Sequence, residues 1–240
     1  MRELSCVRTS LGSLGRMSER LLFPHSEVAR DVLTFAGRAA RHGDGIIRLQ
    51  AGAGILALSC APLSPRSLTD PTPFVLALRT ARVDPELECD LTVDAAALAP
   101  DADDDRAARL PDSAVTAAWS GVSPPRTGWR EDGTLDSARV SLRAQWGIAA
   151  VARQLPTGAG DDVVHLVRSS VWGAPDDDLA GLPLGVAFAA VGLGFIAGAE
   201  KPTIRRTDVW TRVSFARGHV LTRGPVAMGL TPVRATGPGR

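Results

Sequence analysis

The chain has 240 residues, of which 45% are apolar, and a formal net charge of +1. These values are typical of a globular protein and exclude a largely disordered chain and a membrane protein with many spans. Lys201 is the single lysine among 27 basic residues, and tyrosine is absent. Both amino acids have AT-rich codons, so their scarcity indicates a GC-rich bacterial genome. The high arginine content is therefore weak evidence for an anionic partner.

Cysteine usage and the N-terminus predict a cytoplasmic protein. Cys6, Cys60 and Cys89 have no CxxC spacing, and an odd number argues against a disulfide scaffold. The N-terminal residues contain no apolar stretch of the kind that a secretory signal requires. Residues 1–16 lack periodicity and precede a second methionine, Met17, so we interpret them as a non-native or disordered extension.

Residues 17–98 predict an α+β subdomain. A short strand at 20–23 is followed by an amphipathic helix that begins at Ser26, a suitable N-cap, and stops by Gly43. Four short runs rich in valine, isoleucine and leucine then predict a small antiparallel sheet, with strands at 45–50, 55–60, 74–83 and 87–93.

The order of these elements, followed by the small-residue run VDAAALA, resembles one repeating unit of the sliding-clamp fold. The resemblance covers residues 20–98 and rests on the order of the elements, without a residue motif. It implies a fold for this part of the chain, and function does not follow from a fold alone.

The second half of the chain is predicted to be mainly helical. Residues 99–134 are acidic and rich in proline, which predicts a linker. Beyond it we expect two helices, at 134–155 with Thr134 as its cap and at 161–172 with Asp161 as its cap.

Strand-like runs at 208–217 and 219–223 predict a terminal β-hairpin, which could pair with another sheet. This hairpin ends a predicted helical subdomain over residues 135–223. Residues 224–240 are rich in glycine and proline and predict a disordered tail. The predicted fold class is therefore α+β: an N-terminal helix plus a small antiparallel sheet, then a mainly helical half with a buried Gly/Ala-rich helix and the terminal hairpin.

The longest uncharged run, residues 179–199, is long enough to span a membrane. As a span it would leave the whole preceding chain outside the cell without an export signal. Pro183 followed by many small residues instead fits a helix that packs closely inside a protein. We therefore predict a buried Gly/Ala-rich helix, with a single-span membrane anchor through 179–199 as an alternative.

A glycine pattern of the dinucleotide-binding type, G-x-G-x-x-A, occurs at 52–57 and again at 192–197. A nucleotide site needs a long helix directly after the glycines. Neither copy is followed by enough residues for one. We interpret the first copy as a hairpin turn and the second as small residues in a helix, and we predict no cofactor.

No local motif indicates a metal or a catalytic group. Asp101, Asp103, Asp105 and Asp112 match four positions of a calcium loop, but Arg106 stands where the loop needs glycine. We therefore interpret this stretch as a solvated acidic linker and predict no metal. The histidines lack metal-ligand spacing, and the catalytic residues stay unknown.

One helical face suggests a binding surface. His165, Arg168 and Trp172 recur at spacings of three and four along the helix 161–172, away from a valine stripe. Trp and Arg are frequent anchors of protein interfaces. Arg143 on the preceding helix extends this candidate site, and the predicted terminal hairpin adds Arg212 and His219.

The favoured function is therefore a non-catalytic cytoplasmic protein that binds or regulates a partner. The first alternative is an enzyme with a composite site between the two subdomains, drawing on His165, His219, Arg143 and Arg212. A protein partner is expected. Nucleic acid is weakly supported by residues 201–240, which hold eight basic residues against Asp208. A membrane partner is not expected.

Overall fold

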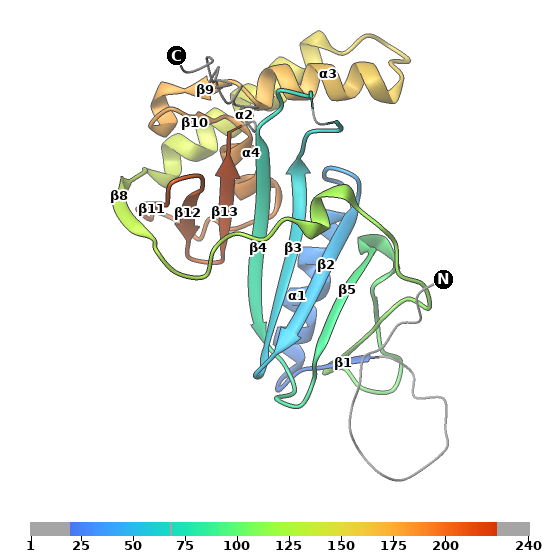
Figure 1. Cartoon of the computed structure of the whole chain (residues 1–240). Coiled ribbons are helices and arrows are strands. Elements are labelled where there is room, and N and C mark those ends of the chain that lie inside the picture. Colours follow the sequence, from blue (N-terminus) through green and yellow to red (C-terminus); the bar gives the residue numbers. More distant parts are fainter. Residues whose placement is uncertain (1–19, 68, 225–240) are drawn as a thin grey trace, which may run out of the picture.

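Figure 1 shows the computed structural model, which describes residues 20–67 and 69–224. Its centre is one eight-stranded antiparallel sheet. In sheet order its strands are β5 (Cys89–Asp94), β2 (Ile46–Gly52), β3 (Ile55–Leu63), β4 (Phe74–Arg82), β13 (Gly218–Arg223), β12 (Thr211–Phe215), β11 (Thr203–Arg206) and β8 (Arg130–Thr134).

Two smaller sheets and four α-helices surround the large sheet. The smaller sheets consist of β1 (Arg20–Leu22), β7 (Ala107–Arg109) and β6 (Ala99–Pro100), and of β10 (Leu182–Pro183) and β9 (Pro175–Asp176). The helices are α1 (Ser26–Ala39), α2 (Ser137–Gln154), α3 (Asp161–Trp172) and α4 (Gly185–Gly192), with short 3-10 turns η1 (Ala95–Ala97), η2 (Ala118–Gly121) and η3 (Asp177–Leu179).

The large sheet joins both halves of the chain, which corrects the predicted layout. β13 pairs with β4, placing Val220 opposite Ala77 and Leu221 opposite Leu76. The two strands that we predicted as a terminal hairpin, β12 and β13, do pair with each other, and they are central strands of the sheet that begins in the first half. The mixed α+β content is right, but the division into a small N-terminal sheet and a mainly helical half is wrong. Periodicity identifies strands without identifying their partners.

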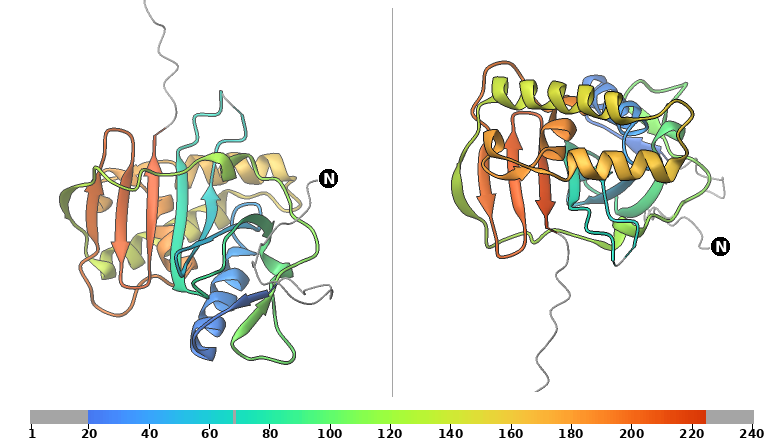
Figure 2. Two further views of the ribbon diagram at one scale, coloured as in Figure 1. Left: turned by 60° about the horizontal axis from the view of Figure 1, so that its bottom comes forward. Right: turned by 90° about the horizontal axis from the view of Figure 1, so that it is seen from above.

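Alternation along the strands gives the sheet two different faces. Val75 and Ala77 on β4 belong to the main core, while Phe74 and Leu76 belong to a smaller apolar cluster on the other face. All four helices lie on the main-core side, with α2 and α3 side by side in the view from above (Figure 2). Trp119, within the predicted linker, is 5% exposed and packs into the smaller cluster.

The uncharged run 179–199 does not form one long helix. It contains the end of η3, then β10 and the eight-residue helix α4. Among residues 20–67 and 69–224, no helix combines the length and apolar character needed to cross a membrane. The alternative of a span through 179–199 is therefore not borne out, and the expected long helix is also wrong. Most α4 residues are nevertheless buried, Val186 and Ala190 completely, while Phe188 and Val191 are partly buried.

The second glycine pattern packs against α1 and its C-terminal turn. A Cβ at Gly192 would lie 2.1 Å from His42 Nε2, and one at Gly194 would lie 1.6 Å from Arg38 Nη1. Gly194 also has φ +71°, a left-handed conformation beyond the end of α4, so the expectation of small residues within a helix is wrong there. The first pattern forms the β2–β3 hairpin turn as predicted, with Gly54 at φ +75°.

Helix ends differ from the predictions by a few residues. Asp136, not Thr134, caps α2, because its carboxylate accepts from the backbone N–H groups of Ala138 and Arg139. Gly160 precedes α3, and Asp161 lies in its first turn. The predicted extension 1–16 and nearly all of the predicted tail 224–240 lie outside the described residues.

Candidate binding pocket

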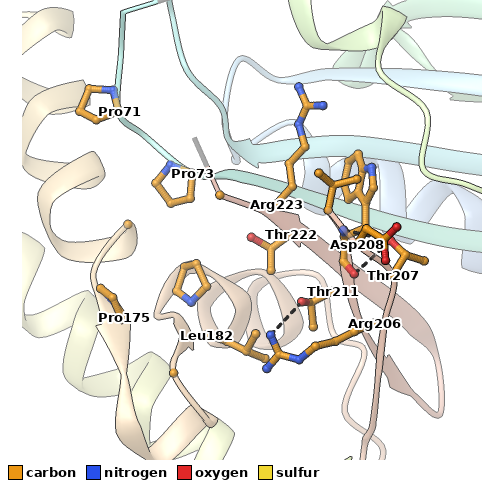
Figure 3. A pocket seen from close by; sticks show the side chains of 16 residues that line it. Pro71, Pro73, Pro175, Leu182, Arg206, Thr207, Asp208, Thr211, Thr222 and Arg223 are labelled. Atoms are coloured by element: carbon orange, nitrogen blue, oxygen red, sulfur yellow. Dashed lines mark hydrogen bonds between the residues drawn. The ribbon is translucent and has the colours of Figure 1, made fainter. Parts of the chain in front are cut away.

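A cavity of about 460 Å³ opens at the edge where β13 ends and β4 and β12 begin. We call it the proline pocket (Figure 3), because its lining includes four prolines from two distant segments: Pro71, Pro73, Pro175 and Pro183. Leu182 and Trp210 add buried apolar surface. Apolar walls with a few polar groups are typical of ligand sites, and this volume is within their usual range.

Local sequence makes these walls rigid. Proline fixes φ and has no N–H group. Pro175 and Pro183 are opposite each other in the β9–β10 ladder. Gly173 permits a close approach on the other side, because a Cβ there would lie 2.9 Å from Pro73 Cδ. A ligand would therefore order little of this wall when it binds.

Trp210 is fixed by the turn between β11 and β12. The backbone N–H of Trp210 donates to Thr207 Oγ1 at 3.1 Å, and the backbone N–H of Thr207 donates to Trp210 O at 2.8 Å. The indole meets the Phe74 ring edge-on, with centroids 5.7 Å apart. Arg223 Cζ lies 5.6 Å from the Trp210 ring centroid and 5.9 Å from that of Phe74. Cation–π contacts thus hold the Arg223 guanidinium at the rim.

The polar groups of the pocket are mainly donors. The Thr222 side chain is 4% exposed, and its Oγ1 has no hydrogen-bond partner among the described residues. Figure 3 shows Thr222 in the pocket wall, with the Arg223 side chain extending away from it on the other face of the strand. Within residues 20–67 and 69–224 the Arg223 guanidinium also has no oxygen acceptor. Arg206 differs, because it pairs with Asp132 and donates to Thr211 Oγ1 at 3.4 Å.

This lining can bind a ligand but lacks groups for acid–base chemistry. Its one carboxylate, Asp208, has a 96% exposed side chain and lies 3.6 Å from Arg130. No histidine or cysteine is among the lining residues. In the described part of the chain, no three His, Cys, Asp or Glu side chains gather as a metal site. Unpaired donors beside apolar walls fit a ligand that offers hydrogen-bond acceptors.

A larger groove of about 760 Å³ lies on the sheet face without helices, beneath the segment that follows Trp119. Its main charged pair is already satisfied, because Arg48 Nε donates to Asp90 Oδ1 at 2.8 Å. That hydrogen bond holds the pKa of Asp90 below its usual range. The groove therefore offers a ligand fewer unpaired groups than the proline pocket does.

The predicted site residues His165 and Arg168 line a third cavity, of about 620 Å³. His165 Nε2 lies 3.0 Å from Asp70 Oδ2 and 3.3 Å from Ser169 Oγ. Burial acts to raise the pKa of Asp70, but hydrogen bonds from Thr72, the Arg66 N–H and His165 hold it well below its usual range. Both partners meet the same imidazole nitrogen, whereas a catalytic triad uses both nitrogens. The three groups therefore form no proton relay.

Trp172 and Arg143 occupy different places. The Trp172 side chain is 2% exposed and stacks on Phe188 at 4.3 Å. It fits beneath α2 because Gly147 has no side chain there: a Cβ would lie 2.2 Å from the indole. Arg143 Nε donates to the buried Asp176 carboxylate at 2.8 Å. The helical face expected to carry the site is thus turned toward the protein interior.

Arg212 and His219 are brought together on the sheet face without helices. Their strand partners are Leu221 and Ser214, which places both on the side of the smaller apolar cluster. Arg212 Cζ lies 4.5 Å from the Trp129 ring centroid, and His219 Nδ1 lies 3.0 Å from Ser214 Oγ. Burial lowers the pKa of His219, with Arg212 adding to the effect. The six predicted residues therefore do not form one site.

Sequence reasoning missed the residues of the proline pocket. Only the clustering of Pro71 and Pro73 before a strand offered a signal. Thr222 and Arg223 are ordinary strand residues in the sequence, and their significance depends on the pairing of β13 with β4. Trp210 likewise required knowledge of the β11–β12 turn.

Two family models match the chain. A domain of unknown function, DUF8010, matches residues 17–121, and another, DUF8185, matches residues 124–227. Neither description names an activity. No curated protein matches the chain.

Solved structures similar to this chain include sliding clamps from Caulobacter crescentus. The DNA polymerase sliding clamp and the pol III beta structure each give a TM-score of 0.46 at 12% identity, covering 92% of this chain and 69% of theirs. A beta sliding clamp with bound polyethylene glycol gives 0.42 at 14% identity, covering 94% and 69%. Likenesses this distant carry no functional argument.

Proposed function

We propose that this protein is a non-catalytic, cytoplasmic binding protein that holds a short acidic segment of a partner protein in the proline pocket. The observation that carries the proposal is the Arg223 guanidinium, which has no oxygen acceptor among the described residues, together with the buried and unpaired Thr222 hydroxyl on the other face of the same strand. Both groups supply donors at the wall of a rigid apolar cavity.

Unpaired donors favour a ligand rich in oxygen acceptors. A buried polar group without a hydrogen bond costs about 1–3 kcal/mol, which a bound acceptor would recover. Arginine presents a planar fork of N–H groups that matches a carboxylate in a two-bonded geometry. Because Arg223 is already stacked on Trp210, little side-chain freedom would be lost on binding.

The apolar walls favour a peptide over a free inorganic anion. Leu182, Trp210 and the four prolines present flat apolar surface that a small anion would not use. A cavity of about 460 Å³ accommodates one or two side chains. The occupant that fits both features is a segment with an apolar residue next to an aspartate or glutamate.

The alternatives receive less support. An enzyme site drawing on His165, His219, Arg143 and Arg212 would need a cavity that joins them, and the three cavities described above include only His165 in their linings. A nucleic-acid site would need unpaired basic side chains between residues 201 and 224. Two of these arginines already have partners, because Arg206 forms an ion pair with Asp132 and Arg212 stacks on the Trp129 ring.

Selection from a random peptide library on the purified full chain tests the proposal. We expect enriched peptides to combine an acidic and an apolar residue. In fluorescence polarisation, Arg223→Gln should weaken their binding at least about tenfold, the loss of one charge-assisted pair. The matched control Arg30→Gln removes an exposed arginine from α1 and should bind as the wild type does. No enrichment, or equal binding by Arg223→Gln, would contradict the proposal.

A further inference from the structure

A second surface, separate from the proline pocket, presents apolar side chains to solvent. Among the described residues, most of the large apolar side chains that are exposed lie on α2 and α3: Leu142 (63% exposed), Trp146 (49%), Ile148 (48%), Val163 (40%) and Leu166 (67%). The two helices lie side by side on one side of the molecule (Figure 2). Leu142 and Trp146 share one face of α2, whereas Ile148 lies about 200° around the helix from Trp146, on another side. Exposed apolar residues on adjacent helices, such as Leu142, Trp146, Val163 and Leu166, mark an interaction site.

The exposure follows from helix geometry rather than from loose packing. On α2 the buried stripe includes Val140, Ala144 and Gly147. Leu142 and Trp146, four residues apart, lie on the opposite side of the same helix. On α3, Trp172 packs inward and Leu166 points away from it. Both helices are therefore fixed by their inner faces, while their outer faces carry large apolar side chains among polar ones.

Trp146 is held ready for a contact. Arg143 Cζ lies 4.5 Å from the Trp146 ring centroid, and Arg143 is itself bonded to the buried Asp176. A tryptophan whose position is fixed before binding loses little freedom at an interface. Trp and Arg are also the residues that most often dominate binding energy.

The charges on this surface are complementary to each other. α2 contains arginines and no acidic residue, and Arg153 near its C-terminus has no ion pair among the described residues. α3 begins with Asp161 and Asp162; Asp162 already accepts from Arg66 Nη1 at 2.9 Å, whereas Asp161 has no ion pair among the described residues. Because six residues connect the two helices and α3 returns alongside α2, the basic end of one and the acidic end of the other lie at the same end of the surface.

We propose that this α2–α3 surface, defined by Leu142, Trp146, Val163 and Leu166, binds a second copy of the chain in a two-fold symmetric dimer. A two-fold axis along the helices stacks α2 of one copy on α3 of the other, because such an axis exchanges the two helices. Arg153 of each copy then meets Asp161 of the other. An axis across the helices would instead stack α2 on α2 and bring arginines together.

Mass measurement by light scattering tests the dimer, with the full chain at about 10 and 100 µM because dimerisation depends on concentration. We expect a dimer mass for the wild type and a monomer mass for Trp146→Glu and Leu166→Glu. The matched control Ile55→Glu places the same charge on another exposed apolar residue, on β3, and should stay dimeric. A monomeric wild type, or a Trp146→Glu variant that remains dimeric, overturns the proposal.

A charge-exchange experiment tests the arrangement of the two copies. Arg153→Asp and Asp161→Arg should each weaken the homodimer at least about tenfold, since each creates like-charge contacts. When the two variants are mixed, both contacts of the mixed dimer again join opposite charges, so dimers should reappear. Failure to form the mixed dimer overturns the proposed axis. Association of wild-type monomers with lipid vesicles instead of with each other would assign the surface to a membrane.

Discussion

Arg223 Cζ lies 5.6 Å from the centroid of the Trp210 ring, at the rim of the proline pocket. The contact fixes the position of the Arg223 guanidinium without neutralising its charge, because stacking on the ring leaves the in-plane N–H groups available for hydrogen bonds. A lysine at this position would keep the charge but lose the stacking and the fork. We therefore expect Arg223→Lys to weaken binding of a selected acidic peptide several-fold, less than Arg223→Gln does. Equal affinities for Arg223→Lys and the wild type in fluorescence polarisation would show that charge alone matters.

Removing the Thr222 hydroxyl should change the stability of the chain and its affinity for the peptide in opposite directions. Replacing it by valine removes a buried polar group without a partner, so Thr222→Val should raise the free energy of unfolding by about 1 kcal/mol. The same variant should bind the peptide more weakly, because it loses a donor. Urea denaturation and peptide titration measure the two effects.

Thr211→Val is the matched control for this substitution. Thr211 Oγ1 accepts from Arg206 Nη1 at 3.4 Å, so its loss should lower stability instead of raising it. If both valine variants change stability in the same direction, the Thr222 hydroxyl is not an unpaired group.

Gly194 has a packing role that Gly198 lacks. Both have positive φ, +71° and +74°, but only at Gly194 would a Cβ meet another residue, Arg38, whose Nη1 donates to Leu193 O at 3.0 Å. An alanine in this backbone region costs about 1–2 kcal/mol. Gly198→Ala should lose only that amount, and Gly194→Ala should lose more. Thermal or urea unfolding compares them, and equal losses would argue against the close packing of Arg38.

His42 should make stability depend on pH. Burial lowers its pKa in the folded chain, the hydrogen bond to Arg38 O opposes this, and Arg168 and Arg41 add to the lowering. The unfolded chain then binds a proton near pH 6.5 while the folded chain resists it. Stability should therefore be constant above that pH for this group and fall as the pH drops below about 6.5.

The variant His42→Gln checks this assignment, because glutamine does not titrate. Its free energy of unfolding should decline less between pH 6.5 and the acid end of the range than that of the wild type. Identical pH profiles for the two proteins would exclude His42 as the cause.

Sequence periodicity identified the local elements of the fold. The first helix was expected at the right place, although His25 and not Ser26 occupies its N-cap position, and the runs at 55–60 and 74–83 fall on β3 and β4. Periodicity could not identify β4 as the partner of β13, since that pairing joins residues about 140 positions apart and depends on the whole sheet. Without this pairing the two halves of the sequence look independent, which is why we predicted two separate subdomains.

The candidate site was less predictable than the fold. The helix 161–172 was expected with His165 and Trp172 on an exposed side, but Gly147 leaves space into which the indole packs. No feature near Trp172 in the sequence reveals a glycine on the neighbouring helix. The proline pocket collects residues from four segments, which only the tertiary structure brings together.

The most direct test of the proposed binding site is a titration of the ¹⁵N-labelled full chain with a library-selected acidic peptide, followed through the five tryptophan indole N–H signals. Trp210→Phe and Trp146→Phe assign the two signals that matter. We predict that the Trp210 signal shifts in proportion to bound peptide while the Trp146 signal stays in place. A bound peptide that shifts Trp119, Trp129 or Trp146 and leaves Trp210 unchanged would contradict it.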